Sequence, residues 1–192
     1  PEGYNDTLHY GVTEAPLSER LSAATTREAC EFLASRPPGP WCACVSYFEP
    51  NEAMVVSRGF FEQYDWRRLP LPASLRDDMR GRPNLYRREQ RIFEGLTDDD
   101  WRMALACYYG RISEIDHLFG RLVAALEASG QLDDTVIVVT ADHGKYVGAH
   151  GFDAHNVGAF EEIYNVPMLM AGPGIAQGER CGALAGVQDL CP

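Results

Sequence analysis

An aspartate and a histidine stand side by side directly after a run of β-branched residues in the second half of the chain. Val136 to Thr140 has the length and composition of a buried strand, and Asp142, His143 and Gly144 follow it at once. Carboxylate oxygens and imidazole nitrogens are ligands for divalent cations, and the glycine permits a tight turn or a close backbone approach. The pattern therefore indicates a metal site at the end of this strand, with a capped turn as the plainer alternative.

The segment after this turn is too long to be a simple connector. Residues 145 to 164 are rich in glycine and contain His150 and His155, and long ordered loops at a strand end often carry function. For His150 a structural role, with the ring bonded to backbone, is favoured over a ligand role. Lys145 directly follows the Asp-His-Gly turn, where it could either contact an anion or face water.

Two elements flank the turn and should hold it. The strand from Val136 is predicted to be a central parallel strand covered on both faces. Before it, Thr97 precedes three aspartates, which favours a helix start, and apolar residues then recur at helical spacing as far as Ser129, followed by Gly130. A long helix from about residue 97 to 129 follows from this pattern. Asp116 within it is interpreted as a surface or packing group.

The remaining pattern predicts an α/β fold. A short amphipathic helix is expected over Thr25–Ser35, a strand over Trp41–Phe48, loops and short helices from Glu49 to Thr97, and a strand over Val166–Ala171. The strand from Trp41, the long helix and the strand from Val136 would form one right-handed β-α-β crossover. Together these elements predict a mostly parallel sheet sandwiched by helices.

Composition excludes some partners. The formal net charge of −11 disfavours nucleic acid, whose phosphates would be repelled. The basic stretch from Arg80 to Arg91 is interpreted as a solvated loop or helix. No stretch approaches the roughly 20 apolar residues that span a bilayer, and six irregularly spaced cysteines favour buried free thiols over a disulfide framework. Neither the compartment nor the oligomeric state is indicated.

Several motifs in order resemble the sulfatase family of the alkaline phosphatase superfamily. They are Tyr108–Asp116, Leu126–Gly130, Thr140–Gly144, Gly148–Gly151 and Glu161–Met170, with a looser likeness in Trp41–Pro50 and Leu69–Pro72. The resemblance implies an alkaline phosphatase-like α/β fold, a sulfuric ester hydrolase, and a substrate that is a small sulfate ester or a sulfated glycan.

The resemblance also implies roles for individual residues. Asp142 and His143 match downstream metal ligands, His155 stands where many members have a lysine that holds the sulfate, and Asn51 stands where members have the histidine of a Glu/Asp-Pro-His motif and would contact the substrate. Lys145 stands where members often have glutamate. The implied metal is Ca²⁺, but because His143 supplies an imidazole, Mn²⁺ and Zn²⁺ are alternatives.

One family feature is absent from these 192 residues. Members use a formylglycine formed within a Cys/Ser-x-Pro/Ala-x-Arg motif, and no cysteine here, from Cys30 to Cys191, stands in such a motif; the early Asp-Asp pair of the metal shell is absent too. We therefore expect residues 1–192 to be a partial catalytic domain, with the nucleophile strands and the C-terminal subdomain outside it. Three hypotheses follow: a sulfatase segment, a phosphonate or phosphate ester hydrolase of the same superfamily, or an inactive fragment that acts at most as a binding module.

Overall fold

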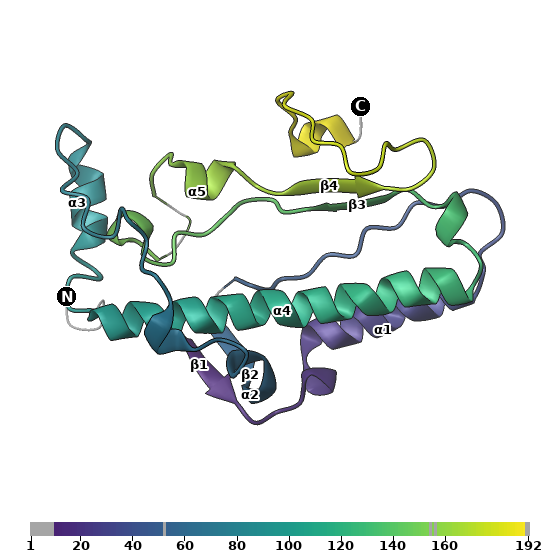
Figure 1. Cartoon of the computed structure of the whole chain (residues 1–192), viewed down its shortest axis with the longest axis horizontal. Helices are drawn as coiled ribbons and strands as arrows, with labels where there is room; N and C mark the ends of the chain where they lie inside the picture. The colour runs from purple at the N-terminus through teal and green to yellow at the C-terminus, as the bar shows by residue number, and fades with distance from the viewer. Residues whose placement is uncertain (1–9, 52, 154, 156, 191–192) are drawn as a thin grey trace.

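The computed structural model describes residues 10–51, 53–153, 155 and 157–190, and it has the predicted α/β composition. The elements lie around one long central helix (Figure 1). The strands are β1 (Tyr10–Thr13), β2 (Met54–Ser57), β3 (Ile137–Thr140) and β4 (Met168–Ala171). The helices are α1 (Leu21–Ala34), α2 (Arg58–Phe61), α3 (Asn84–Gln90), α4 (Asp98–Ala128) and α5 (Glu161–Tyr164). Short 3₁₀ turns occur at 17–19, 66–68, 132–134, 149–151 and 187–190.

The predicted long helix is confirmed as α4. Thr97 caps it, since its side chain accepts a hydrogen bond from the Asp100 backbone N–H while the Asp100 carboxylate accepts one from the Thr97 backbone N–H. This capping box satisfies two of the N–H groups that a helix start leaves without partners. In Figure 1, α4 runs through the centre with α1 along its lower side and the β3–β4 ladder above it.

The parallel crossover of this chain is β1-α1-β2. β1 and β2 pair in parallel, with Tyr10 opposite Met54, and α1 connects them. β2 packs closely on α4, because a Cβ added to Gly110 would lie 2.7 Å from Val56 Cγ2. The predicted crossover through Trp41, the long helix and the strand from Val136 is therefore wrong, although the unit type is correct.

The predicted strand Trp41–Phe48 does not form in the described chain. Residues 41–48 run without regular structure between α4 and the β3–β4 ladder (Figure 1), and both Cys42 and Cys44 are exposed. Trp41 Nε1 donates to Gln131 Oε1 at 3.1 Å, and the hydroxyls of Tyr47 and Thr26 lie 2.8 Å apart. Apolar residues favour an extended chain here, but a strand also needs a neighbour to pair with.

β3 differs from its predicted environment. It pairs antiparallel with β4, with Ile137 opposite Ala171, and Val138 and Val139 are both 37% exposed. The expectation of a parallel strand covered on both faces is wrong for the described residues. The β-branched run correctly predicts a strand here. Whether that strand is buried depends on other elements that pack over its faces.

Among the described residues, three buried clusters form the core. One joins β2 to α4 through Met54, Val56 and Leu105. A second is formed largely by residues of the loop after β3, among them Tyr146, Phe152 and Phe160. A third consists of Leu75, Phe93 and Trp101 at the start of α4.

The cysteines only partly follow the expectation of buried thiols. Cys107 is buried, and burial raises the pKa of its thiol to about 11. Cys30 is half-buried, whereas Cys42, Cys44 and Cys181 are exposed. Within the described residues, no helix is long and apolar enough to cross a membrane.

Candidate functional site

Asp142 lies in the turn that follows β3 and points into solvent. Its side chain is 88% exposed, and Oδ1 accepts a hydrogen bond from the His143 backbone N–H at 2.9 Å. One carboxylate oxygen is thus engaged by the turn itself, in the manner of an aspartate that stabilises its own loop. The other oxygen, Oδ2, remains directed toward the imidazole of His143, at 3.7 Å from Nε2.

The His143 ring has a fixed tautomer when neutral. Its Nδ1 lies 2.8 Å from the carbonyl oxygen of Gly144, and because a carbonyl oxygen can only accept, Nδ1 carries the proton. Nε2 then keeps its lone pair, on the side of Asp142 Oδ2. A backbone acceptor on the far ring nitrogen is the arrangement that orients metal-binding histidines in proteins.

The structure brings His155 to the same place. The rings of His143 and His155 are stacked, with centroids 4.1 Å apart and planes inclined by 14°. The loop after β3 folds back to make this contact from twelve residues further along the chain. Asp142, His143 and His155 therefore form one group at the end of β3.

Gly144 is required by a close backbone approach. Its N–H donates to Ile163 O at 2.8 Å, and a Cβ at this position would lie 1.8 Å from Glu162 O. α5 is thus packed directly against the turn. The sequence predicted Gly144 to permit a tight turn or a close backbone approach. The structure shows the close approach, between the turn after β3 and α5.

Lys145 is directed into the protein. Its side chain is 5% exposed and Nζ lies 3.6 Å from Asp153 Oδ2, which is 1% exposed. Of the two alternatives for Lys145, the one in which it faces water is therefore wrong. Its charge is balanced locally by Asp153 across the loop.

His150 has the structural role predicted for it. Its ring nitrogens, however, face two carboxylates and not the backbone. Nδ1 lies 2.9 Å from Asp77 Oδ2 and Nε2 lies 3.5 Å from Glu162 Oε1. The ring is stacked on Phe160 at 3.8 Å. The hydrogen bond from His150 holds the pKa of Asp77 below its ordinary value.

The Tyr146 side chain is buried within this loop and cannot serve as a base. It is 3% exposed, and burial raises its pKa to about 12. The phenol therefore stays protonated at neutral pH. A Cβ on Gly158 would lie 2.8 Å from its hydroxyl, so the loop closes tightly over the ring.

Asn51 occupies a separate turn. Its backbone N–H donates to Phe48 O at 3.2 Å, and the peptide bond before Pro50 is cis. This geometry matches the turn alternative for Asn51. A contact of its side chain with substrate stays a prediction.

The sequence reasoning missed a buried charge network that anchors this turn. Arg111 Nη2 lies 2.8 Å from Glu49 Oε1, and Nη1 is paired with Glu114 Oε2. Glu114 Oε1 also accepts from the Ser57 N–H at 2.8 Å, and Arg20 reaches the same carboxylate at 3.8 Å. The available signal was an arginine and a glutamate three residues apart on an otherwise buried helix face.

The donor set of the β3 turn fits a divalent cation in part. Asp142 Oδ2 and His143 Nε2 are 3.7 Å apart, and cations hold such ligands at about 2.0 to 2.6 Å, so one ion could contact both atoms. Among the described residues no cluster of three or more His, Cys, Asp or Glu side chains is arranged around a common point. Two ligands of this chain are therefore compatible with a cation, and further ligands would come from other groups.

Two solved enzymes have folds similar to that of this chain. A phosphonate monoester hydrolase from Silicibacter pomeroyi has a TM-score of 0.76 at 29% identity, covering 85% of this chain and 35% of that protein. The phosphonate monoester hydrolase of Agrobacterium radiobacter has a TM-score of 0.69 at 25% identity, with the same coverage of both chains. The fold is thus the alkaline phosphatase-like α/β fold.

The chain belongs to the sulfatase family, because the Sulfatase family model matches residues 2–192. A choline-sulfatase from Rhizobium meliloti is 32% identical over 145 residues, which are 72% of this chain and 28% of that protein. A multifunctional alkaline phosphatase superfamily protein from Trinickia caryophylli is 28% identical over 193 residues, covering 91% of this chain and 37% of that protein. The chain spans about a third of the length of these relatives.

Proposed function

We propose that this chain supplies part of the divalent-metal and sulfate-binding site of a sulfuric ester hydrolase. The observation that carries the proposal is the group at the end of β3, where the His143 tautomer is fixed by Gly144, Asp142 Oδ2 lies beside Nε2, and His155 is stacked on the ring. Membership in the sulfatase family supports the same reaction class.

Each residue has a distinct role in this proposal. Asp142 and His143 would hold the cation through Oδ2 and Nε2. A bound divalent cation would supply positive charge for the oxygens of the ester and lower the pKa of the nucleophile. His155 would donate a hydrogen bond to a sulfate oxygen, and Asn51 would offer an amide N–H to the substrate. The formylglycine nucleophile would lie outside residues 1–192.

The donor types bear on which cation is preferred. Ca²⁺ takes oxygen ligands, whereas Mn²⁺ and Zn²⁺ accept imidazole readily. Ca²⁺ is the metal that the family resemblance implies, and His143 makes Mn²⁺ and Zn²⁺ the alternatives. Metal analysis of the purified protein that contains this chain would distinguish them.

A second candidate is a phosphonate monoester hydrolase of the same superfamily. It is favoured by the two phosphonate monoester hydrolases whose folds match at TM-scores of 0.76 and 0.69. A sulfate monoester and a phosphonate monoester present similar anionic oxygens to the same donors. The third candidate is a binding module without turnover.

One experiment separates the three candidates. The protein that contains this chain is assayed on 4-nitrophenyl sulfate and on 4-nitrophenyl phenylphosphonate, after chelation and after restoring each of the three cations. A higher kcat/KM on the sulfate ester supports the sulfatase proposal. A higher kcat/KM on the phosphonate shifts the assignment to the second candidate, and no turnover with any cation leaves only the binding module.

A further inference from the structure

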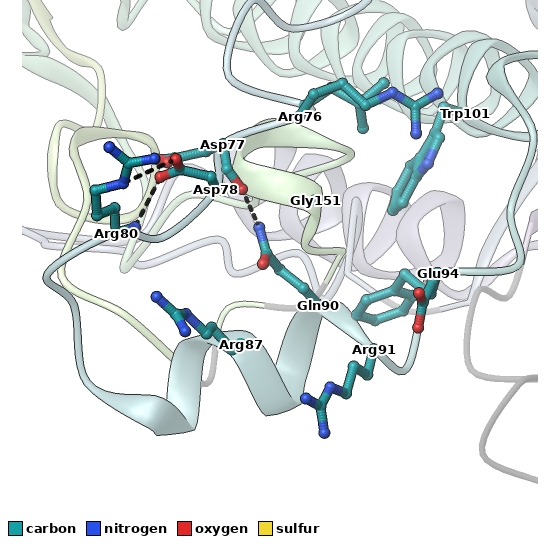
Figure 2. A pocket seen from close by; sticks show the side chains of 12 residues that line it. Arg76, Asp77, Asp78, Arg80, Arg87, Gln90, Arg91, Glu94, Trp101 and Gly151 are labelled. Atoms are coloured by element: carbon teal, nitrogen blue, oxygen red, sulfur yellow. Dashed lines mark hydrogen bonds and ion pairs between the residues drawn. The ribbon is translucent and has the colours of Figure 1, made fainter.

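A hollow of about 570 Å³ lies apart from the β3 turn, between α3, the start of α4 and the loop that precedes α3. Arginines project from both of its sides (Figure 2). We call this hollow the arginine groove, and its polar lining includes Arg76, Asp77, Arg80, Arg87, Arg91 and Glu94. Asp142, His143 and His155 are not part of it.

The arginine groove is positively charged within an acidic protein. Its lining holds four arginines (76, 80, 87 and 91) and three carboxylates (77, 78 and 94), a net charge of +1, whereas the whole chain carries −11. A local concentration of cationic side chains on an otherwise negative surface attracts anions to that point. The groove is therefore a place where this chain could capture a negative group despite its overall charge.

Two of the three carboxylates that line the groove, Asp77 and Asp78, are already engaged. Asp77 accepts hydrogen bonds from His150 Nδ1 at 2.9 Å and from the Met79 N–H at 3.1 Å. Asp78 accepts from the Arg80 N–H at 2.8 Å and lies 3.5 Å from Arg80 Nε. These local bonds leave the two acids poorly placed to neutralise arginines on the opposite side of the groove.

Arg87 and Arg91 remain available on the α3 side. Both are exposed, and within the described part of the chain neither guanidinium group has a hydrogen bond or an ion pair. Four residues apart, they are neighbours on the helix surface, where like charges disfavour the helix slightly. An anion between or beside them would remove this repulsion, and guanidinium groups match sulfate and carboxylate oxygens through paired N–H donors.

The groove is held in shape by contacts to the loop after β3. Gln90 Nε2 donates to Asp77 O at 2.7 Å (Figure 2). It also donates to His150 O at 2.9 Å, so α3 is tied to both segments. Gly151 lines the floor with a φ of 71°, and a Cβ there would lie 3.2 Å from Leu75 O. The positive φ and this tight contact both favour glycine, which keeps a side chain out of this part of the lining.

A short series of contacts joins the groove to the β3 turn. His150 Nε2 lies 3.5 Å from Glu162 Oε1 on α5. Ile163, which follows Glu162 in α5, accepts a hydrogen bond from the Gly144 N–H through its backbone oxygen. α5 thus supports the groove loop and the candidate metal turn at once.

We propose that the arginine groove binds a second anionic group of the substrate, a sulfate or carboxylate, away from the ester that is cleaved. The substrate class would then be polyanionic, such as an oligosaccharide with more than one charged group. This inference rests on the proposed function for the identity of the cleaved ester.

The test uses the complete protein that contains this chain, with chelator present so that turnover does not interfere. Isothermal titration calorimetry at constant ionic strength compares a disulfated disaccharide with its monosulfated counterpart. We expect the disulfated ligand to bind roughly tenfold more tightly, because its second sulfate would gain charge-assisted hydrogen bonds from the groove arginines. The double variant Arg87→Gln/Arg91→Gln should lose this preference.

The control is Arg68→Gln/Arg88→Gln, which removes the same formal charge from exposed arginines outside the groove and should keep the preference. Equal binding of the two ligands by the unmodified protein would overturn the inference, as would equal effects in the two double variants. If inorganic sulfate instead strengthens binding of the monosulfated ligand, and does so only when Arg87 and Arg91 are present, the groove takes a free anion and the substrate assignment is wrong. Sulfate ester hydrolysis, assayed separately with metal, decides the proposed function on its own.

Discussion

Arg111 on α4 and Glu49, just before Pro50, form a buried ion pair with 2.8 Å between Nη2 and Oε1. Their side chains are 3% and 8% exposed. The pair attaches the turn that carries Asn51 to the central helix. Arg111 also pairs with Glu114 on the same helix, and Arg20 near that carboxylate balances the second negative charge. The position of a candidate substrate contact therefore depends on a residue that cannot itself reach solvent.

Loss of Arg111 should destabilise the protein strongly. Arg111→Ala leaves Glu49 buried without its ion-pair partner and Glu114 with only the more distant Arg20, and breaking a buried pair in this way costs about 3 to 5 kcal/mol. Urea unfolding of the complete protein would measure the free energy of unfolding. Arg58→Ala, which removes an exposed pair with Glu14, is the matched control and should have little effect, since exposed pairs contribute little. Similar losses in both variants would contradict the assigned importance of burial.

Asp142→Asn should weaken metal binding sharply. The substitution keeps the size of the side chain and an oxygen that can accept the His143 N–H, but removes the negative charge that favours a divalent cation. The metal content of the purified variant, measured by inductively coupled plasma mass spectrometry, should fall well below that of the unmodified protein. Asp116→Asn on α4 is the control. Undiminished metal in Asp142→Asn would remove this residue from the ligand set.

His155→Ala should lower kcat/KM on a sulfate ester by roughly tenfold or more, as expected for the loss of a charge-assisted contact. His155→Lys places at this position the residue that many family members have, and it should recover much of the activity because an ammonium group also donates to sulfate. Steady-state kinetics on one substrate would compare the two variants. If alanine leaves kcat and KM unchanged, the stacked position on His143 has no role in anion binding.

The local elements could be predicted from the sequence better than the sheet around them. α4 could be predicted because its cap, its apolar stripe and its terminal glycine lie within the helix itself. The turn at Asp142 and His143 could be predicted for the same reason, since a strand followed directly by these residues is a local signal. The strand expected at Trp41–Phe48 and the covering of β3 depend on neighbours distant in the chain, which the pattern of residues 41–48 does not contain. The stacking of His155 on His143 likewise arises from the fold of a twenty-residue loop.

The pair of Asp77 and His150 should make stability depend on acid pH. The hydrogen bond from His150 lowers the folded-state pKa of Asp77 below its ordinary value. A carboxyl group of this kind stabilises the fold above its unfolded pKa, and the contribution disappears as pH falls through the folded pKa. The loss should therefore occur below about pH 4, the ordinary range of aspartate. In Asp77→Asn the midpoint of thermal unfolding should fall at pH 7 and vary less between pH 5 and pH 3, whereas an unaltered acid slope would argue against this pair.

Gly144→Ala should disrupt the site more than its small size suggests. The added Cβ would lie 1.8 Å from Glu162 O, a backbone atom that a side-chain rotation cannot move, so α5 must shift away from the turn. Because α5 also supplies the Glu162 contact of His150, the shift should reach the groove loop as well as the candidate metal ligands. Gly120→Ala on α4 is the control, since its Cβ would meet nothing within 4 Å and alanine favours a helix by roughly 0.5 to 1 kcal/mol. Thermal unfolding and metal content should both decrease in Gly144→Ala and not in Gly120→Ala. If Gly144→Ala retains normal metal content and stability, the close packing of α5 is not what holds the turn.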